Sequence, residues 1–387
     1  MRGLPAGWYR DAARSTRELT TLFLRSWQFV CHASDLPSAG TAARFDCAGR
    51  SALVLRHRDG TLRAFRNACR HRGARLVDGD AHTGLAFCVD GRVRCPYHGW
   101  TYDDTGSLVA IPDTQDFGTI DRTTHALHPI QVEQWRGLVF VAFDAPSSSL
   151  AQMLDAVVVD WPDMTTLRRL SEPRTTALAA DWKLACQQLL DTAHFDVPRP
   201  SPKPRVFASP RYTPCGKDAV RATVALAESG NALWSARIYQ RLLSPDATAA
   251  TPRAEFLYVW PNLLLCLSPD GLRVAQVLPG APGCSVLREV RCGSADTRRT
   301  MRLLRYAHER VARRARGEDL RLLERTQHGL GSLDDDEAGP LDAREAGLRW
   351  FVERYHAALP GVAASAGQTT RVKRARTTRK AVTATLA

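Results

Sequence analysis

The sequence predicts an α+β fold, in which an N-terminal all-β domain precedes an α+β domain with an antiparallel sheet and flanking helices. Residues 51–66 contain two alternating apolar runs joined by Asp59-Gly60, which is a strong hairpin signal. Later in the chain, a long helix-like stretch runs from Asp296 to Gly329, with Asp296 and Thr297 as candidate caps. Between them lie strand-like runs at 219–227, 254–259, 262–267 and 272–278.

The remaining patterns divide the 387 residues into four segments. Residues 1–40 are expected to form a helical segment that packs on the second domain, and residues 41–145 the all-β domain, with a strand at 137–143. Pro146 to Ser149 resembles a turn or linker before the second domain, residues 146–360. Further helices are expected near 150–159, 182–194 and 341–359.

The net charge of +13 raises the question of nucleic-acid binding. Six of these charges lie in residues 361–387, which contain no acid and no apolar periodicity. We expect this basic tail to be disordered, and nucleic acid is not an expected partner. No secretory signal or membrane-length apolar run is evident, and the ten scattered cysteines do not suggest a disulfide framework. The sequence therefore predicts a cytoplasmic protein without membrane association.

Two short loops each provide one thiolate and one imidazole. The first is Cys69-Arg70-His71-Arg72-Gly73, and the second is Cys95-Pro96-Tyr97-His98-Gly99. In a Rieske [2Fe–2S] centre two cysteines bind one iron and two histidines bind the other. The sequence therefore predicts a Rieske cluster held by Cys69, His71, Cys95 and His98. The alternative is a structural zinc site, but zinc motifs usually pair Cys with Cys and His with His.

These loops, CRHRGARL and CPYHGWTYDDTGSL, resemble the Rieske domain of ring-hydroxylating oxygenase α subunits. The resemblance extends over residues 5–358, through stretches such as LPAGWYRD, HPIQVEQWRGLVFVAF, DWKLACQQLLDTAHF and EDLRLLERTQHGL. One departure is the longer spacing between His71 and Cys95, which we interpret as a longer hairpin around 79–92.

The resemblance implies a second site, a mononuclear iron held by two histidines and one carboxylate. His194 matches the first ligand, and Asp319 matches the distant carboxylate. Asp191, three residues before His194 and expected on the same helical face, matches the acid that bridges to a neighbouring subunit's cluster in the family. The position of the second histidine is occupied by Arg199.

Arginine stays protonated and has no lone pair for a metal. The iron triad is therefore incomplete, and Gln187 and Gln188, where the family usually has Glu-Asn, also suggest a drifted site. Arg199 could instead bind an anionic group or pair with Asp191. His308 and His328 lie eleven and nine positions from Asp319, too far to share an iron with it on one unbroken helix.

Two classes of function follow. The first is an oxygenase α subunit that passes electrons from the cluster to Fe(II) and hydroxylates or demethylates a small organic substrate. The second is a non-catalytic electron-transfer or structural subunit, assembled with an active paralogue. A third, weaker alternative is oxygenase-like chemistry at an iron with an altered set of ligands. The resemblance implies a ferredoxin or reductase as donor, and a homotrimer or a heteromer with an active α or a β subunit. Trp260, Phe256, Leu263 and Leu265 are candidate pocket residues, although core packing explains them equally.

Overall fold

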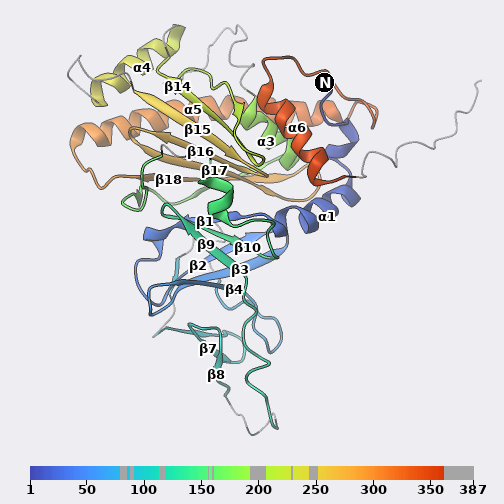
Figure 1. Ribbon diagram of the computed structural model, residues 1–387, viewed down its shortest axis with the longest axis vertical. Coiled ribbons are helices and arrows are strands. Elements are labelled where there is room, and N and C mark those ends of the chain that lie inside the picture. The colour runs from blue at the N-terminus through green and yellow to red at the C-terminus, as the bar shows by residue number, and fades with distance from the viewer. Residues whose placement is uncertain are drawn as a thin grey trace, which may run out of the picture.

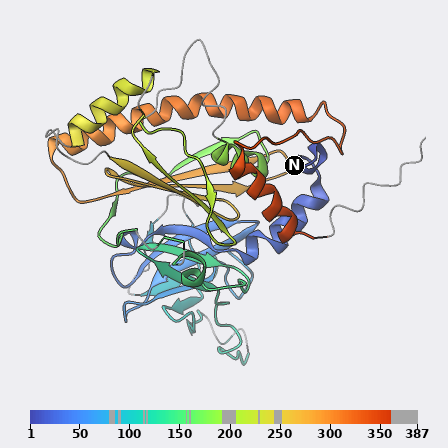
Figure 2. The ribbon, with the colours of Figure 1, turned by 45° about the horizontal axis from the view of Figure 1, so that its top comes forward.

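The computed structural model describes residues 1–78, 85–87, 91–112, 115, 118–155, 157–158, 161–191, 206–227, 230–243 and 252–360. One large sheet lies between a group of helices on one side and the smaller sheets of the first domain on the other (Figure 1). Helices α3, α4 and α5 lie on the face of this sheet that points away from the first domain (Figure 2). The small strands β7 and β8 form the end of the molecule most distant from these helices (Figure 1).

The first domain contains three antiparallel sheets within the described residues, with strand orders β1-β10-β9, β4-β3-β2-β5 and β6-β7-β8. Their bounds are β1 Gln28–His32, β2 Thr41–Cys47, β3 Arg50–Arg56, β4 Leu62–Arg66, β5 Leu85–Phe87, β6 Arg92–Arg94, β7 Thr101–Asp103, β8 Leu108–Ala110, β9 Gln131–Trp135 and β10 Leu138–Ala142. The hairpin predicted over 51–66 is confirmed as β3 and β4, and Gly60 has the positive φ of 86° that the turn requires.

Strand β5 pairs with β2, whereas β6 pairs with β7. Most of residues 79–92, where a longer hairpin was predicted, lie outside the described residues; in the part that is described, β5 and β6 belong to different sheets. The N-terminal segment is also not purely helical. It contains a 3₁₀ turn Ala6–Tyr9, α1 Ala12–Thr21 and a second 3₁₀ turn Phe23–Arg25, and then β1 joins the sheet of β9 and β10.

The second domain is built on an eight-stranded antiparallel sheet, counted over the described residues, with the order β11-β18-β17-β16-β15-β14-β13 and β12 also paired with β18. Its strands are β11 Arg168–Arg169, β12 Arg174–Leu178, β13 Thr213–Pro214, β14 Ala219–Ala225, β15 Arg253–Val259, β16 Leu263–Ser268, β17 Gly271–Pro279 and β18 Ser285–Gly293. The four predicted strand runs are confirmed as β14 to β17. The strand β18, which pairs with β17 from Ser285 to Cys292, was not predicted.

Alternation along the strands gives the sheet two different faces. Leu265, Val274 and Val290 belong to a core with Phe29 and Phe140 of the first domain. The opposite side chains, such as Ala275, which is paired with Glu289, face the helices and border a cavity. The sheet therefore separates the contact between the domains from the cavity beneath the helices.

The helices are α2 Leu150–Leu154, α3 Trp182–Leu190, α4 Gly230–Leu243, α5 Arg299–Leu330 and α6 Ala346–Ala358, with α1 at the N-terminus. Helix α5 was predicted to begin at Asp296 or Thr297, but its N-cap is Arg298, because Asp296 accepts from the backbone and guanidinium of Arg298. Helix α3 was predicted to reach residue 194, but it ends at Leu190. None of the described helices has the length and apolar character needed to span a bilayer.

A buried ion network attaches α1 to α3 and α6. Lys183 and Glu18 are fully buried, and the Lys183 ammonium lies 2.9 Å from Glu18 Oε1 and 2.8 Å from Asp181 Oδ1. Trp182 Nε1 donates to Glu18 at 2.7 Å, and the Tyr355 hydroxyl donates to the other Glu18 oxygen. These bonds satisfy charges that would otherwise be costly to bury, and they fix the helix that leads to Asp191.

Candidate functional site

The two cysteine–histidine loops have nearly the same backbone structure. In the first, Cys69 donates its N–H to Ala74 and accepts from Gly73; in the second, Cys95 donates to Trp100 and accepts from Gly99. Both glycines have positive φ, 76° at Gly73 and 71° at Gly99. A side chain at Gly99 would also clash with Pro112, 2.9 Å from the Cβ position. The first loop follows β4 and the second follows β6, so the two loops are positioned by two different sheets.

The loops bring like donors together. Both thiols are buried, and Cys69 lies within hydrogen-bonding reach of Cys95. The rings of His71 and His98 have centroids 4.7 Å apart, and the Trp100 ring stacks on His71 at 4.9 Å. His98 lies on the exposed side, next to the exposed Tyr97. The arrangement is a thiol pair beneath an imidazole pair, with the imidazoles nearer to solvent.

The electrostatics of the loops act in opposite ways on the two kinds of ligand: they favour the metal-binding form of His71 and disfavour that of Cys69. Burial lowers the pKa of His71, and the nearby His98 and Arg72 lower it further, so its neutral imidazole is favoured. Burial raises the pKa of the Cys69 thiol, while a hydrogen bond from Tyr102 opposes this rise. A bound metal deprotonates such thiols, as thiolate ligation requires.

Tyr102 is a functional candidate that was not identified from the sequence. Its hydroxyl accepts from the Arg70 backbone N–H at 2.9 Å and lies 3.3 Å from Cys69 Sγ. Because the oxygen accepts from Arg70, its hydrogen is available to donate to the sulfur. In the sequence, the feature that could have pointed to Tyr102 is its position two residues after Trp100. Its contact with the first loop depends on the fold, which places β7 next to that loop.

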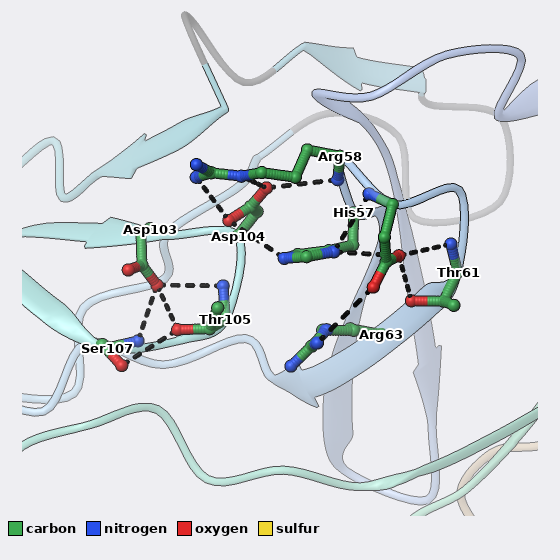
Figure 3. A network of polar contacts seen from close by, with 9 residues as sticks. His57, Arg58, Thr61, Arg63, Asp103, Asp104, Thr105 and Ser107 are labelled. Carbon is green, nitrogen blue, oxygen red and sulfur yellow. Dashed lines mark hydrogen bonds and ion pairs between the residues drawn. The ribbon is translucent and has the colours of Figure 1, made fainter.

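A polar network connects two turns of the first domain (Figure 3). Asp104, after β7, accepts from the Arg58 side chain at 2.9 and 3.0 Å, and His57 Nε2 lies 3.5 Å from the same carboxylate. On its other side, His57 Nδ1 lies 2.9 Å from Asp59. The network connects the β3–β4 turn to the β7–β8 turn and so fixes the sheet that holds the second loop relative to the first.

The donor set fits a [2Fe–2S] group of the Rieske type. Each iron of such a cluster takes only two protein ligands, a thiolate pair or an imidazole pair. Zinc would need four donors around one point. In the part of the chain that the structure describes, no three His, Cys, Asp or Glu side chains converge on one point. The separated pairs therefore fit two adjacent irons better than one zinc.

A cavity lies between the helices and the large sheet of the second domain. One lobe, of about 240 Å³, is bordered by residues that include Phe207, Tyr212, Phe256, His308 and Asp319. The adjoining lobe, of about 220 Å³, is bordered by Glu289, Arg316, Leu320 and again Asp319. Asp319 therefore lies where the two lobes meet, on the wall formed by α5.

The structure positions some of the predicted iron-site residues. The Gln188 side chain donates to the Asp319 carbonyl at 2.6 Å and so connects α3 with α5. Asp191 follows the end of α3 with extended φ and ψ of −78° and 116°. The expectation that Asp191 and His194 share a helical face is therefore wrong at Asp191. His194 and Arg199 lie outside the described residues, as do His82 and Cys88.

Of the four candidate pocket residues, only Phe256 borders the cavity within the described structure. Leu263 and Leu265 point to the opposite face of the sheet and pack in the core shared with the first domain. Trp260 is buried among Trp182, Trp350 and Phe351. Helix α5 is unbroken from Arg299 to Leu330, so His308 and His328 remain distant from Asp319, as expected.

Comparison with known families agrees with this geometry. Residues 26–130 match the family described as Rieske [2Fe-2S] domain, and residues 164–361 match the ring hydroxylating alpha subunit (catalytic domain). The chain therefore belongs to the ring-hydroxylating α-subunit family, with a Rieske domain preceding its catalytic domain. The Rieske domain implies a [2Fe–2S] cluster, and the catalytic domain implies a mononuclear iron.

The chain is similar to several characterised proteins over part of its length. It is 31% identical over 195 residues to the carnitine monooxygenase oxygenase subunit of Escherichia coli (strain K12), covering 49% of this chain and 50% of that protein. It is 29% identical over 210 residues to the N,N-dimethyl phenylurea N-demethylase subunit alpha of Sphingobium sp. (strain YBL2), covering 50% and 44%. The matches thus span about half the length of these relatives.

Solved structures share the fold over most of the chain. A quaternary ammonium Rieske monooxygenase superposes with a TM-score of 0.75 at 20% identity, covering 92% of this chain and 94% of the other. A variant of naphthalene 1,2-dioxygenase gives a TM-score of 0.70 at 18% identity, covering 92% of both chains. At this level of identity the likeness establishes the fold and leaves the chemistry to the residues.

Proposed function

We propose that this chain is a Rieske oxygenase α subunit that hydroxylates or demethylates a small organic substrate. The observation that carries the proposal is the pairing of Cys69 with Cys95 and of His71 with His98 at one end of the chain. The cavity that contains Asp319 supports it as the place for the substrate. When bound, the cluster supplies single electrons and the iron supplies dioxygen activation.

The reaction balances as a monooxygenation. A substrate C–H group, one O₂, two electrons and two protons give C–OH and water. Demethylation follows when the hydroxylated carbon is bonded to nitrogen or oxygen and is released as an aldehyde. The two electrons come from an outside donor, for which we propose a ferredoxin or a reductase, and we propose the cytoplasm as the compartment.

The arrangement of one chain favours electron transfer between subunits. The cluster loops lie near β7, whereas Asp319 lies on α5 at the opposite end of the molecule (Figure 1). We propose that a trimer, or a heteromer with a β subunit, brings the cluster of one subunit next to the cavity of its neighbour. Asp191, at the end of α3, is the proposed bridge between them.

We propose that His194 and Asp319 hold the mononuclear iron. Asp319 suits this role because it is half-buried and borders both lobes of the cavity. The donor set that the sequence assigns is one ligand short, since Arg199 stands at the position of the second histidine. Two protein ligands should hold Fe²⁺ more weakly than the complete facial triad.

Arg199 favours a second candidate function, a non-catalytic electron-transfer or structural subunit that works with an active paralogue. Iron analysis distinguishes the two. With the cluster intact, an oxygenase should bind a third iron when Fe²⁺ is added anaerobically, and a chelator should remove this iron more easily than from the Arg199→His variant. It should also consume two electrons for each substrate oxidised. Two irons at every Fe²⁺ concentration, with cluster reduction but no substrate oxidation, would establish the second function.

A further inference from the structure

A buried polar cluster on the cavity wall holds the ring of His308 in one orientation. His308 Nδ1 lies 3.0 and 3.1 Å from the two carboxylate oxygens of Asp270, in the turn between β16 and β17. Tyr239 and Ser268 also donate to Asp270, at 2.6 and 2.8 Å. Asp270 is buried, and although burial opposes ionisation, the bonds from His308 and its neighbours hold its pKa well below the usual range. Because an ionised carboxylate only accepts, Nδ1 carries a hydrogen.

The other ring nitrogen of His308 is the one available to a molecule in the cavity. Nε2 makes no hydrogen bond within the described part of the chain, and His308 borders the larger lobe. The rings of Phe207 and Tyr239 pack edge-on against the imidazole, with centroids at 5.9 and 5.3 Å. In metal sites, a carboxylate bonded to one ring nitrogen fixes the orientation of a histidine so that the other nitrogen can bind its ligand. His308 has the same arrangement, with Asp270 on Nδ1 and the cavity beside the ring.

The cavity face of α5 gives this histidine a defined place relative to the iron-site carboxylate. His308, Val311, Ala312, Ala315 and Asp319 all border the larger lobe. Eleven residues correspond to just over three helical turns, so His308 and Asp319 lie on the same face, about 16 Å apart along the axis. The two alanines between them leave room for a ligand, and Phe207, Tyr212 and Phe256 provide apolar walls.

The charges near His308 favour an anionic ligand. Arg273 also borders this lobe, and its guanidinium lies 3.7 Å from Glu309, beyond hydrogen-bonding distance. Glu309 is engaged more closely by Arg313 at 2.9 Å and Arg291 at 3.3 Å. Apart from Asp319, no acidic side chain borders the larger lobe among the described residues. This part of the wall therefore offers Arg273 as a donor, and His308 Nε2 as a second donor when both ring nitrogens carry hydrogens.

We propose that His308, held by Asp270, and Arg273 bind an oxyanion of the substrate, a carboxylate in the simplest case. The substrate is then an apolar chain or ring with the anionic group at one end and the oxidised carbon toward Asp319. Asp270 is the positioning residue, because its carboxylate fixes the orientation of the His308 ring. This inference rests on the proposed function, in which the bound molecule is oxidised, but the binding itself can be measured without turnover.

Calorimetry on the full-length holoprotein tests the inference. The probes are phenylalkanoates from phenylacetate to 6-phenylhexanoate and the matching primary amides. A charge-assisted hydrogen bond predicts that at least one carboxylate binds about tenfold to a hundredfold more tightly than its amide. In His308→Gln this preference should disappear, while the amide keeps its affinity. The inference is overturned if no carboxylate is preferred over its amide, or if the preference survives in His308→Gln.

Two further variants keep the test valid if His308→Gln folds poorly. Asp270→Asn and Arg273→Gln should each reduce the carboxylate preference several-fold without changing amide binding, an effect that a purely structural role would not produce. His328→Gln, an exposed histidine on the same helix, is the matched control and should behave as wild type. Carboxylate preference in protein that never oxidises substrate contradicts only the proposed function; active protein without the preference contradicts only this inference.

Discussion

Replacing Lys183 with methionine should destabilise the protein strongly while leaving its shape almost unchanged. The ammonium is fully buried and lies within 3.0 Å of carboxylate oxygens of both Glu18 and Asp181. Methionine fills a similar volume but removes the ammonium that both buried carboxylates contact. Removing one partner of a buried ion pair typically costs about 3–5 kcal/mol. We therefore expect the free energy of unfolding to fall by about that amount.

The effect should also depend on pH in a defined direction. Burial raises the pKa of Asp181 even in the native protein, although Lys183 opposes the rise. A carboxyl with a raised pKa in the folded state favours folding when it is protonated, so its contribution is present at low pH and is lost as pH rises. The destabilisation of Lys183→Met should therefore shrink as the pH is lowered, because the Asp181 carboxyl, whose pKa is raised, can protonate.

Denaturant titrations at neutral and mildly acidic pH measure both effects. Lys217→Met is the matched control, since Lys217 is exposed, and it should change stability by no more than about 0.5 kcal/mol. A loss below about 1 kcal/mol in Lys183→Met, or one that grows as the pH falls, would show that α1 is not held to α3 by this ion network.

Two further predictions concern the cluster domain. Tyr102→Phe removes the hydrogen bond to Cys69, which should stabilise the more negative reduced cluster. The reduction potential should therefore fall by about 20–60 mV in a spectroelectrochemical titration. An unchanged potential would show that the hydroxyl does not donate to the sulfur. The bond from Arg58 holds the pKa of Asp104 below its usual value, so its stabilisation is present above about pH 4 and is lost as pH falls through the folded pKa. Asp104→Asn should accordingly lose less stability between neutral pH and about pH 3 than wild type, and equal losses would mean that this network does not brace the domain.

Local signals in the sequence were sufficient for the elements that depend on neighbouring residues. The Asp59-Gly60 turn predicted its hairpin, and apolar periodicity located β14 to β17 and the long helix α5. The strand β18 was missed because it contains Arg288, Glu289 and Arg291 among its apolar residues. Their partners, such as Arg316 for Glu289 at 2.8 Å, come from distant segments, and no local pattern shows that such charges can be buried.

The functional site also contains some features that local motifs predict and others that depend on contacts between distant segments. The four residues predicted to bind the cluster follow from two short motifs, and the structure places them in pairs. Tyr102 and the Asp270–His308 pair were not identified, because each depends on contacts between elements far apart in the chain. The end of α3 at Leu190 was also missed, since apolar residues continue the helical pattern past the point where Asp191 takes an extended conformation.

The most direct test of the central claim is electron paramagnetic resonance of anaerobically purified, reduced protein, together with iron and acid-labile sulfide analysis. The account predicts a Rieske-type signal, with about two cluster irons and two sulfides per chain. Cys69→Ser should lose both signal and sulfide. Protein that instead contains zinc, has no labile sulfide and gives no signal on reduction would contradict the assignment of these paired loops to a redox cluster.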